Sequence, residues 1–503
     1  MDHFAPEAGP GGAGRLHIGE LASSFAALPE RFFVRQAPVP VRQPRLLEFN
    51  EPLALELGLD VRALGEDDLA ALFAGNRLPH GGEPIAMAYA GHQFGGFVPQ
   101  LGDGRALLLS EVIDREGRRR DIQLKGSGRT AFSRGGDGRA ALGPVLREYL
   151  ISEAMHRLGI PATRALAAVL TGETVMRETH LPGAVLTRIL ASNIRIGTFQ
   201  YFAARGDTEA IRELADYAIA RHYPELASGP DPHLALLCRV IEKQAALVAQ
   251  WLNIGFVHGV MNTDNMAISG ETIDFGPCAF MDAYDPATVF SSIDSAGRYA
   301  YGNQPYIAQW NLARFAETLL PLIDPDEQRA IGKAGEAVGR FSAVFQDAWL
   351  RGMREKLGLF HEATGDSGLI QDLLELLYRE GVDFTAFFRS LCDVAATLDD
   401  NAAARLFASP GTFKPWAERW LARLRAETLD AQALAAAMRQ RNPAFIPRNY
   451  WVEQALNAAL AGDMQPFDRL FAVLQNPYET QPAFARYAEP PPADKPYVTF
   501  CGT

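Results

Sequence analysis

The sequence predicts an α+β fold of two lobes, the first built from strands with one helix and the second mostly helical. Residues 85–204 are rich in glycine and in the apolar/polar alternation of strands. From residue 205 the chain changes to long Ala/Leu-rich helical patterns. A polar loop over 258–276 interrupts these helices, and this loop is where we expect the chemistry.

The chain before the first lobe, residues 1–84, is expected to be a tail and an extension. Residues 1–15 combine acidic residues with glycine and proline and predict a disordered tail. Residues 20–80 mix short helical patterns with proline-rich stretches such as 37–44. We expect this segment to pack onto the main body.

Strands and one helix are expected in the first lobe, residues 85–204. Strand-like alternation occurs at 105–112, 121–125 and 168–177. Within the last of these, Thr171-Gly-Glu-Thr174 predicts a hairpin turn. A helical pattern near 143–158 has apolar residues spaced for a buried stripe.

Helices dominate the rest of the chain. In the second lobe, residues 205–400, we expect them at 208–221, 232–253, 307–321, 326–357 and 367–381. In the C-terminal extension and tail, residues 401–503, we expect them at about 400–408, 414–425, 429–440, 449–461 and 464–474. The last 25 residues are rich in proline and are expected to be extended.

Composition argues against several classes of protein. The 503 residues are 48% hydrophobic, enough for sizeable cores, and the net charge of −12 argues against nucleic-acid and membrane-surface binding. No apolar run approaches the ~20 residues that cross a bilayer, and the N-terminus resembles neither a signal nor a transit peptide. Four widely separated cysteines fit a reducing compartment. We therefore expect a bacterial-type cytoplasmic protein without membrane or nucleic-acid partners.

One loop of the second lobe has the spacing of a protein-kinase catalytic loop. Kinases carry a His and an Asn seven residues apart, then Asp-Phe-Gly, and this Asn and the second Asp hold metal ions on ATP. His258 and Asn265 have that separation, and Asp274 begins an Asp-Phe-Gly. Asn265 and Asp274 are the candidate metal ligands; an N-cap and a turn residue are the alternative. The kinase base is replaced by Val260, so Asp264 is the candidate base, unless it is a second metal ligand or a turn residue.

Two glycine-containing loops of the first lobe are candidate phosphate-binding segments. Gly102 and Gly104 precede Arg105 at the start of a strand, and backbone N–H groups without side chains can cradle a phosphate. An ordinary tight turn has the same pattern. The loop at 126–139 combines glycines with arginines and contains Asp137 and Gly138. Such a loop suits anion binding, although a solvated loop is the alternative.

Charged side chains of the first lobe are candidates for holding the nucleotide. Lys125 ends a strand, and Glu148 follows 23 residues later in the helical pattern, as in the Lys–Glu pair of kinases. Taken alone, Lys125 could be a solvated lysine, and Glu153 competes with Glu148 as its partner. Arg188 and Arg195 lie seven residues apart and could face a common site or form a surface charge pair.

The chain resembles the selenoprotein O family, whose bacterial members are called YdiU proteins, over nearly its whole length. The segments that carry the resemblance are 90–105, 123–130, 258–266 and 273–277, with 442–449 and the C-terminal Cys501-Gly-Thr similar to the family's tail. Selenocysteine occupies the tail position in some eukaryotic members, and here it is Cys501. Residues 281–303 contain no cysteine, so a disulfide between them and the tail is not expected, and a redox role for Cys501 stays open.

The resemblance implies a two-lobed protein-kinase-like fold with N- and C-terminal extensions, in which ATP lies inverted. AMP would pass from ATP to a Ser, Thr or Tyr hydroxyl of another protein, with Mg²⁺ or Mn²⁺ as cofactor, and bacterial members are also described as transferring UMP from UTP. Asp264 would be the base, and Asn265 and Asp274 would hold the metal. The implied nucleotide contacts are Gly102, Gly104, Arg105, Lys125, Asp137, Gly138, Arg188 and Arg195.

Two other functions compete with nucleotidyl transfer. A kinase that transfers the γ-phosphate, either to protein or to a small molecule as aminoglycoside phosphotransferases do, would normally carry Asp where this chain has Val260. A catalytically inactive nucleotide-binding scaffold would not need Lys125, Glu148, Asn265 and Asp274 together. The sequence therefore favours a protein adenylyltransferase.

Overall fold

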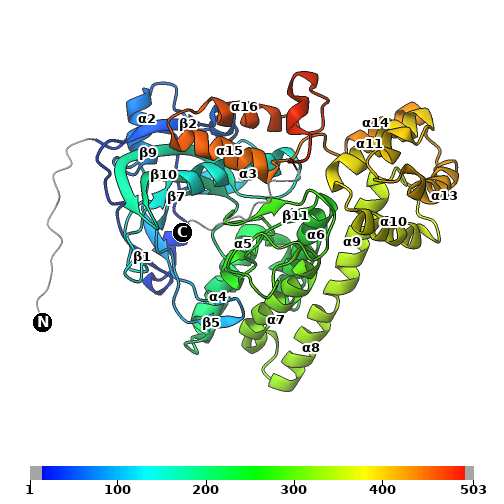
Figure 1. Ribbon diagram of the computed structural model, residues 1–503. Coiled ribbons are helices and arrows are strands. Elements are labelled where there is room, and N and C mark those ends of the chain that lie inside the picture. The colour runs from blue at the N-terminus through cyan, green and yellow to red at the C-terminus, as the bar shows by residue number, and fades with distance from the viewer. Residues whose placement is uncertain (1–13, 493–503) are drawn as a thin grey trace, which may run out of the picture.

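The computed structural model describes residues 14–492, so Cys501 and all but the last two residues of the predicted disordered tail, 1–15, lie outside the described residues. Its main element is an antiparallel sheet, at the left of Figure 1. In sheet order the strands are β1 (Phe33–Arg35), β3 (Ile85–Met87), β6 (Ala106–Ile113), β7 (Arg119–Lys125), β10 (His180–Leu190), β9 (Arg164–Met176) and β2 (Arg45–Phe49), with β8 (Ala140–Ala141) paired to β10. The helical part follows, which confirms the predicted α+β, kinase-like class.

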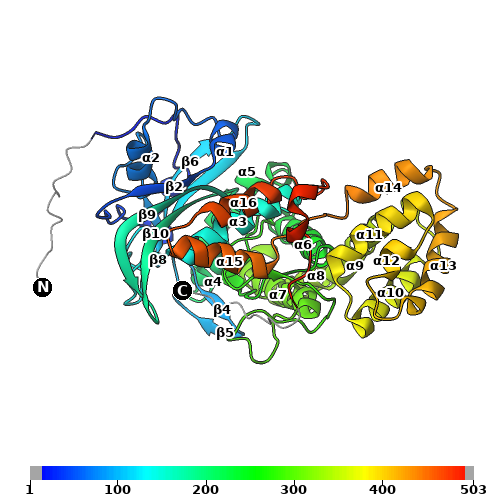
Figure 2. The same cartoon turned by 45° about the horizontal axis from the view of Figure 1, so that its top comes forward.

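Helices cover both faces of the sheet, so its central strands are largely buried. One face packs on α1 (Glu51–Glu56) and α2 (Glu66–Phe73), and Leu109 and Leu124 are buried there. The other face packs on α3 (Leu142–Arg157), as Figure 2 shows. The sheet is thereby fixed between two hydrophobic layers. The ends of β7 and β10 that carry Lys125 and Arg188 are held rigidly as a result.

The segment before residue 85 contributes to the main body. Strands β1 and β2 are part of the sheet, and α1 and α2 cover one of its faces. The domain boundary placed at residue 84 stays a prediction. The contacts of these four elements nevertheless support the expected packing of residues 20–80 against the first lobe.

The hairpin turn predicted at 171–174 is wrong. These residues lie inside β9, where Gly172 has φ +69° and the pairing with β10 shifts between Pro182 and Ala184. The chain reverses later, where the Arg177 N–H donates to the Thr179 carbonyl. A glycine in the left-handed region is compatible with a bulge as well as a turn, and here it marks the bulge.

The second lobe is a layered group of helices (Figure 1). They are α4 (Ile196–Ala203), α5 (Thr208–His222), α6 (Pro232–Asn253), α7 (Gln304–Ile323), α8 (Glu327–Gly339) and α9 (Phe341–Lys356). The single helix predicted over 326–357 is wrong, because Gly339 closes α8 and α9 begins at Phe341. Glycine is a poor helix residue, and three glycines lie within α8. Helix α4 was not predicted.

The C-terminal part lies in two places. The helices α10 (Asp366–Glu380), α11 (Phe384–Thr397), α12 (Asn401–Ala404), α13 (Lys414–Leu424) and α14 (Ala431–Arg439) form a group at the right of Figures 1 and 2. Helices α15 (Asn449–Leu460) and α16 (Gln465–Leu474) return to α3 of the first lobe. Helix α11 was missed, and a 3₁₀ turn at Pro482–Tyr487 lies where extended chain was expected. In the described chain, no helix is long and apolar enough to cross a membrane.

Candidate active site

A cavity of about 520 Å³ lies where the sheet meets the second lobe. The loop between β11 (Phe256–Val257) and β12 (Ala279–Phe280) forms one side of it. The first lobe contributes Asp103, Gly104, Arg105, Lys125, Arg188 and Arg195 to the lining, and the loop contributes Val260, Asn262, Asp264, Asn265 and Asp274. The cavity therefore brings together most of the residues predicted from the sequence.

His258 fixes the loop and does not line the cavity. Its Nε2 is 2.9 Å from the Ile273 carbonyl, and the Val260 N–H donates to its Nδ1 at 3.4 Å. Burial lowers the pKa of this imidazole, so it stays neutral with the proton on Nε2. The ring thus ties the residue before Asp274 to the start of the loop. The Asn265 amide nitrogen also donates to the Val260 carbonyl, at 2.9 Å.

Asp274 is the centre of a buried charge cluster. Its Oδ1 accepts from Lys125 Nζ at 3.0 Å and from Arg188 Nη1 at 2.5 Å, and its Oδ2 accepts from Arg195 Nη1 at 3.1 Å. Burial alone would raise the pKa of this carboxyl, but the three cations hold it well below its usual range. Asp274 also has φ +59°, a left-handed conformation that is uncommon outside glycine and concentrates at functional sites.

The contact predicted between Lys125 and Glu148 is present. Lys125 Nζ lies 2.6 Å from Glu148 Oε2, and Arg188 Nη1 lies 3.1 Å from Glu148 Oε1. The competing Glu153 is engaged elsewhere, in a two-pronged pair with Arg164 at 2.8 Å for each oxygen. Glu148 itself is not part of the cavity lining; it positions two cations that are.

The two arginines converge from different elements. Arg188 lies near the end of β10 and donates to Gln123 on β7, whereas Arg195 is the N-cap of α4. Arg195 also donates to the Asp264 carbonyl at 3.0 Å and lies 4.7 Å above the Tyr89 ring. Both side chains are about 97% buried. The alternative of a surface charge pair is therefore wrong.

Asp264 is a buried carboxyl with one free oxygen. Its Oδ2 accepts from Gln93 Nε2 at 3.4 Å, while Oδ1 has no hydrogen-bond partner among the described residues. Burial raises its pKa to about 6, against the opposing effect of Arg195. Gly91 leaves room for this carboxyl, because a Cβ there would lie 2.6 Å from Oδ1. A carboxyl group that lines the cavity and has a raised pKa suits a general base.

The glycines before Arg105 are required by packing. Gly102 has φ +69°, and a Cβ on it would lie 2.2 Å from the Phe132 ring, whereas a Cβ on Gly104 would lie 3.0 Å from the Phe132 carbonyl oxygen. Gly104 lines the cavity and Gly102 does not. Arg105 lines it too, and within residues 14–492 its guanidinium has no hydrogen-bond or ion-pair partner. It is the cation best placed to meet a phosphate.

Asp137 and Gly138 are not brought to the cavity. Asp137 is paired with Arg177 at 2.8 Å, and its side chain is 45% exposed. Gly138 has φ +69°, and a Cβ on it would lie 2.2 Å from the Gly128 backbone. The glycine is thus explained by the packing of its own loop. A nucleotide contact by these two residues stays a prediction.

Several residues of the cavity were not predicted from the sequence as site residues. Tyr89, Gln93 and Asp103 are among them. Asp103 accepts from the Met87 N–H, and burial raises its pKa to about 6. Its position between Gly102 and Gly104 was a usable signal. Nothing in the spacing of Tyr89 and Gln93 predicts their contacts with Arg195 and Asp264.

Comparison with known proteins agrees with this geometry. The model of the family "Protein adenylyltransferase SelO" matches residues 18–475. The chain belongs to the SelO family. It is 61% identical over 487 residues to the protein nucleotidyltransferase YdiU of Rhizobium etli strain CIAT 652, covering 96% of this chain and 97% of that one. The protein of the same name from Rhodopseudomonas palustris strain BisB18 is 59% identical over 483 residues, covering 96% and 98%.

Family membership establishes the type of enzyme. SelO proteins are protein adenylyltransferases, so this chain is an enzyme that transfers AMP to proteins, with ATP as donor. The rival assignment as an inactive scaffold is thereby excluded.

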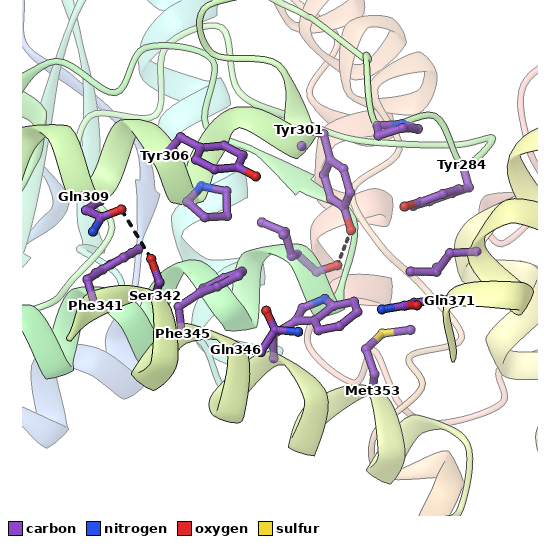
Figure 3. A pocket seen from close by; sticks show the side chains of 16 residues that line it. Tyr284, Tyr301, Tyr306, Gln309, Phe341, Ser342, Phe345, Gln346, Met353 and Gln371 are labelled. Atoms are coloured by element: carbon purple, nitrogen blue, oxygen red, sulfur yellow. Dashed lines mark hydrogen bonds between the residues drawn. The ribbon is translucent and has the colours of Figure 1, made fainter. Parts of the chain in front are cut away.

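A second cavity of the SelO chain lacks the chemistry for this transfer. It has a volume of about 360 Å³ and lies between α7, α9 and the segment after β12 (Figure 3). Tyr306, Phe341, Phe345 and Met353 are among its sixteen lining residues, none of which is charged. A triphosphate needs cations or backbone donors. The nucleotide is therefore expected at the charged cavity.

Proposed function

We propose that this SelO protein holds ATP by its β- and γ-phosphates at the base of the charged cavity and presents the α-phosphate to a protein hydroxyl. The observation that carries this proposal is the convergence of Lys125, Arg188 and Arg195 on Asp274. A kinase needs one such lysine. Two additional buried arginines supply charge for a triphosphate seated more deeply, which supports the inverted orientation.

Asp264 is the proposed general base. The acceptor hydroxyl of a Ser, Thr or Tyr side chain would lie against the carboxylate of Asp264, which lines the cavity. Because the pKa of this carboxyl is raised to about 6, it is ionised at neutral pH and still basic enough to take the proton. As the hydroxyl oxygen attacks the α-phosphorus, pyrophosphate leaves, and the cations around Asp274 stabilise its charge.

Asn265 and Asp274 are the proposed metal ligands. Both line the cavity, and an amide with a carboxylate offers the oxygen donors that Mg²⁺ and Mn²⁺ prefer. Within residues 14–492 no group of three or more acidic, His or Cys side chains forms a metal cage, so phosphate oxygens would complete the shell. A bound Mg²⁺ or Mn²⁺ would neutralise phosphate charge and orient the leaving group. We include UTP as a second donor in this proposal. The proposed contacts of the cations and of the metal are with the phosphates, which ATP and UTP share, and not with the nucleobase.

The orientation is tested with ATP labelled separately at the α- and γ-phosphates. We expect label on protein from the α position alone, and none from an Asp264→Asn variant. Label on protein from the γ position alone would show that the enzyme transfers the γ-phosphate, as a kinase does. The same comparison with α-labelled UTP, in Mg²⁺ and in Mn²⁺, tests the second donor.

A further inference from the structure

A small hairpin at the edge of the catalytic cavity stands apart from the main sheet (Figure 2). It consists of β4 (Gly91–Gln93) and β5 (Gly96–Val98), paired only with each other among the described strands. Gln93 and Phe94 line the cavity. Any acceptor that reaches Asp264 must therefore pass close to this hairpin.

The β4 side of the hairpin is fixed to the catalytic loop. The His92 N–H donates to Thr263 Oγ1 at 2.7 Å, and the Phe94 N–H donates to Asn262 Oδ1 at 3.0 Å. The tip is also held, because the Phe94 ring packs edge-on against Tyr299 at 5.1 Å. The hairpin is thus fixed to the two residues that directly precede Asp264.

The β5 side carries free backbone groups. In an antiparallel pair, opposed residues alternate between bonding each other and pointing outward. The His92 N–H points outward to Thr263. His92 and Phe97, which lie opposite each other, are therefore a non-hydrogen-bonded pair. Phe97 must then direct its own N–H and carbonyl away from β4. Neither group has a hydrogen-bond partner among residues 14–492.

The turn of the hairpin is strained, which indicates that its shape matters. Phe94 has φ +51° and Gly95 has φ +88°, as in the tight two-residue turns that favour Asn-Gly. A bulky residue with positive φ is unusual and persists where the surroundings impose it. The strained residue is also the one whose N–H and ring are bound to the catalytic side, so the hairpin is held in one place.

We propose that the free edge of β5 binds an extended segment of the protein substrate as an added strand, pairing through the Phe97 backbone. This inference rests on the proposed function and adds how the acceptor is placed. A strand added to β5 continues past the hairpin tip towards the cavity, so its pairing with Phe97 sets which residue reaches Asp264. Backbone pairing recognises an extended segment of varied sequence, with side-chain specificity added by neighbouring surface.

The exposed side chains around this edge define the preferred sequence. Phe94 is 38% exposed, Phe97 42% and Ile293 65%, and both Phe94 and Ile293 line the cavity. Apolar surface of this kind favours apolar side chains flanking the acceptor hydroxyl. The substrate class is therefore an extended, apolar-flanked Ser, Thr or Tyr segment.

The decisive variant is Phe97→Pro in the full-length enzyme. Proline lacks the outward N–H and obstructs a partner strand, yet it is tolerated on an edge strand because that N–H is not used within the hairpin. The probe is a library of 13-residue peptides with one central Ser, Thr or Tyr, incubated with α-labelled ATP. We expect kcat/KM for the peptides to fall by about tenfold or more, with the Kd of ATP unchanged. Phe97→Ala is the matched control, since it keeps the backbone donor and should lose less.

A second measurement does not depend on how the proline variant folds. Peptides selected from the library are methylated at one backbone nitrogen at a time and offered to the wild-type enzyme. We expect loss of labelling at alternate positions on one side of the acceptor, the signature of a paired strand. Uniform tolerance of N-methylation, or wild-type transfer by Phe97→Pro, would overturn the proposal.

Other results would contradict either the pairing of the substrate with β5 or the nucleotidyl transfer itself. A loss by Phe97→Ala equal to that of Phe97→Pro would show binding through the ring and overturn strand pairing. Higher peptide labelling by Phe97→Pro, or a rate per enzyme that falls with enzyme concentration, would mean that this chain itself covers the edge. Absence of α-label on any peptide or protein with the wild-type enzyme would refute the proposed function instead, so the two failures are distinguishable.

Discussion

At the scale of single residues, Asp264 decides whether the chain has a catalytic base. Asp264→Asn keeps the size of the side chain and one acceptor oxygen but cannot take a proton. We expect the transfer rate to fall by about 10²–10⁴-fold, with binding of ATP and Mg²⁺ nearly intact by calorimetry. Binding lost in parallel with activity would instead assign Asp264 to the metal shell.

The raised pKa of Asp264 makes a second prediction. The base must be ionised, and burial places its pKa at about 6. The kcat/KM for the acceptor should therefore rise with pH through about 6 and level off above it, falling about tenfold for each pH unit below. A pH profile measured with saturating metal checks this. The residual kcat/KM of Asp264→Asn should not rise with pH near 6. A rise near pH 6 in this variant would show that another group titrates there.

Asp274 has two proposed roles, as a metal ligand and as the counter-charge of three cations, and the Asp274→Ala variant tests both. Removing the carboxylate in Asp274→Ala takes away the proposed metal ligand and one counter-charge of Lys125, Arg188 and Arg195. We expect transfer to be abolished and the strengthening of ATP binding by Mg²⁺ to disappear. Binding of metal-free ATP should persist, since the site becomes more positive. Titrations with and without Mg²⁺ measure both, and an unchanged response to Mg²⁺ would remove Asp274 from the metal site.

At the scale of elements, the Lys125–Glu148 pair connects β7 to α3. Since the two residues are in contact, losses of kcat/KM in Lys125→Met and Glu148→Gln should not add, with a coupling of about 0.5–3 kcal/mol in a double-mutant cycle. Glu153→Gln is the control on the same helix, because Glu153 pairs with Arg164. Its effect should add to that of Lys125→Met. Additive losses for the 125–148 pair would argue against the contact.

Individual elements also differ in how well the sequence predicts their structure and their part in the site. Motifs with fixed spacing, such as Asn265 to Asp274, identify residues that meet in one cavity because a local loop brings them together. The packing of Tyr89 and Gln93 depends on contacts between distant segments, which no local pattern encodes. Local ambiguity explains the wrong turn at 171–174, because Gly172 fits a bulge and a turn equally well. Asp137 fitted the expected residue type, yet its partner is Arg177 on the surface.

At the scale of the whole molecule, buried arginines tie the C-terminal helices to the catalytic lobes. Arg147 on α3 donates to the Cys278 carbonyl and to Asn449 Oδ1, both at 2.5 Å, and pairs with Glu453 on α15. One side chain thus contacts the first lobe, the segment after Asp274 and the returning helix α15. Helix α15, which the sequence predicts as part of an appended extension, is thus bonded through Arg147 to the segment that follows Asp274.

Arg448 provides the test of this arrangement. Its guanidinium is fully buried, bonds Asp282 and the Ala488 carbonyl, and pairs with Asp383 at 2.8 Å. Arg448→Met fills similar volume but leaves two carboxylates without their cation. Breaking a buried pair from one side costs about 3–5 kcal/mol, and the urea midpoint should fall accordingly. Arg441→Met, whose 54% exposed side chain pairs with Glu355, should cost less than about 1 kcal/mol. Equal, small losses in both variants would mean that Arg448 does not hold the C-terminal segment to the second lobe.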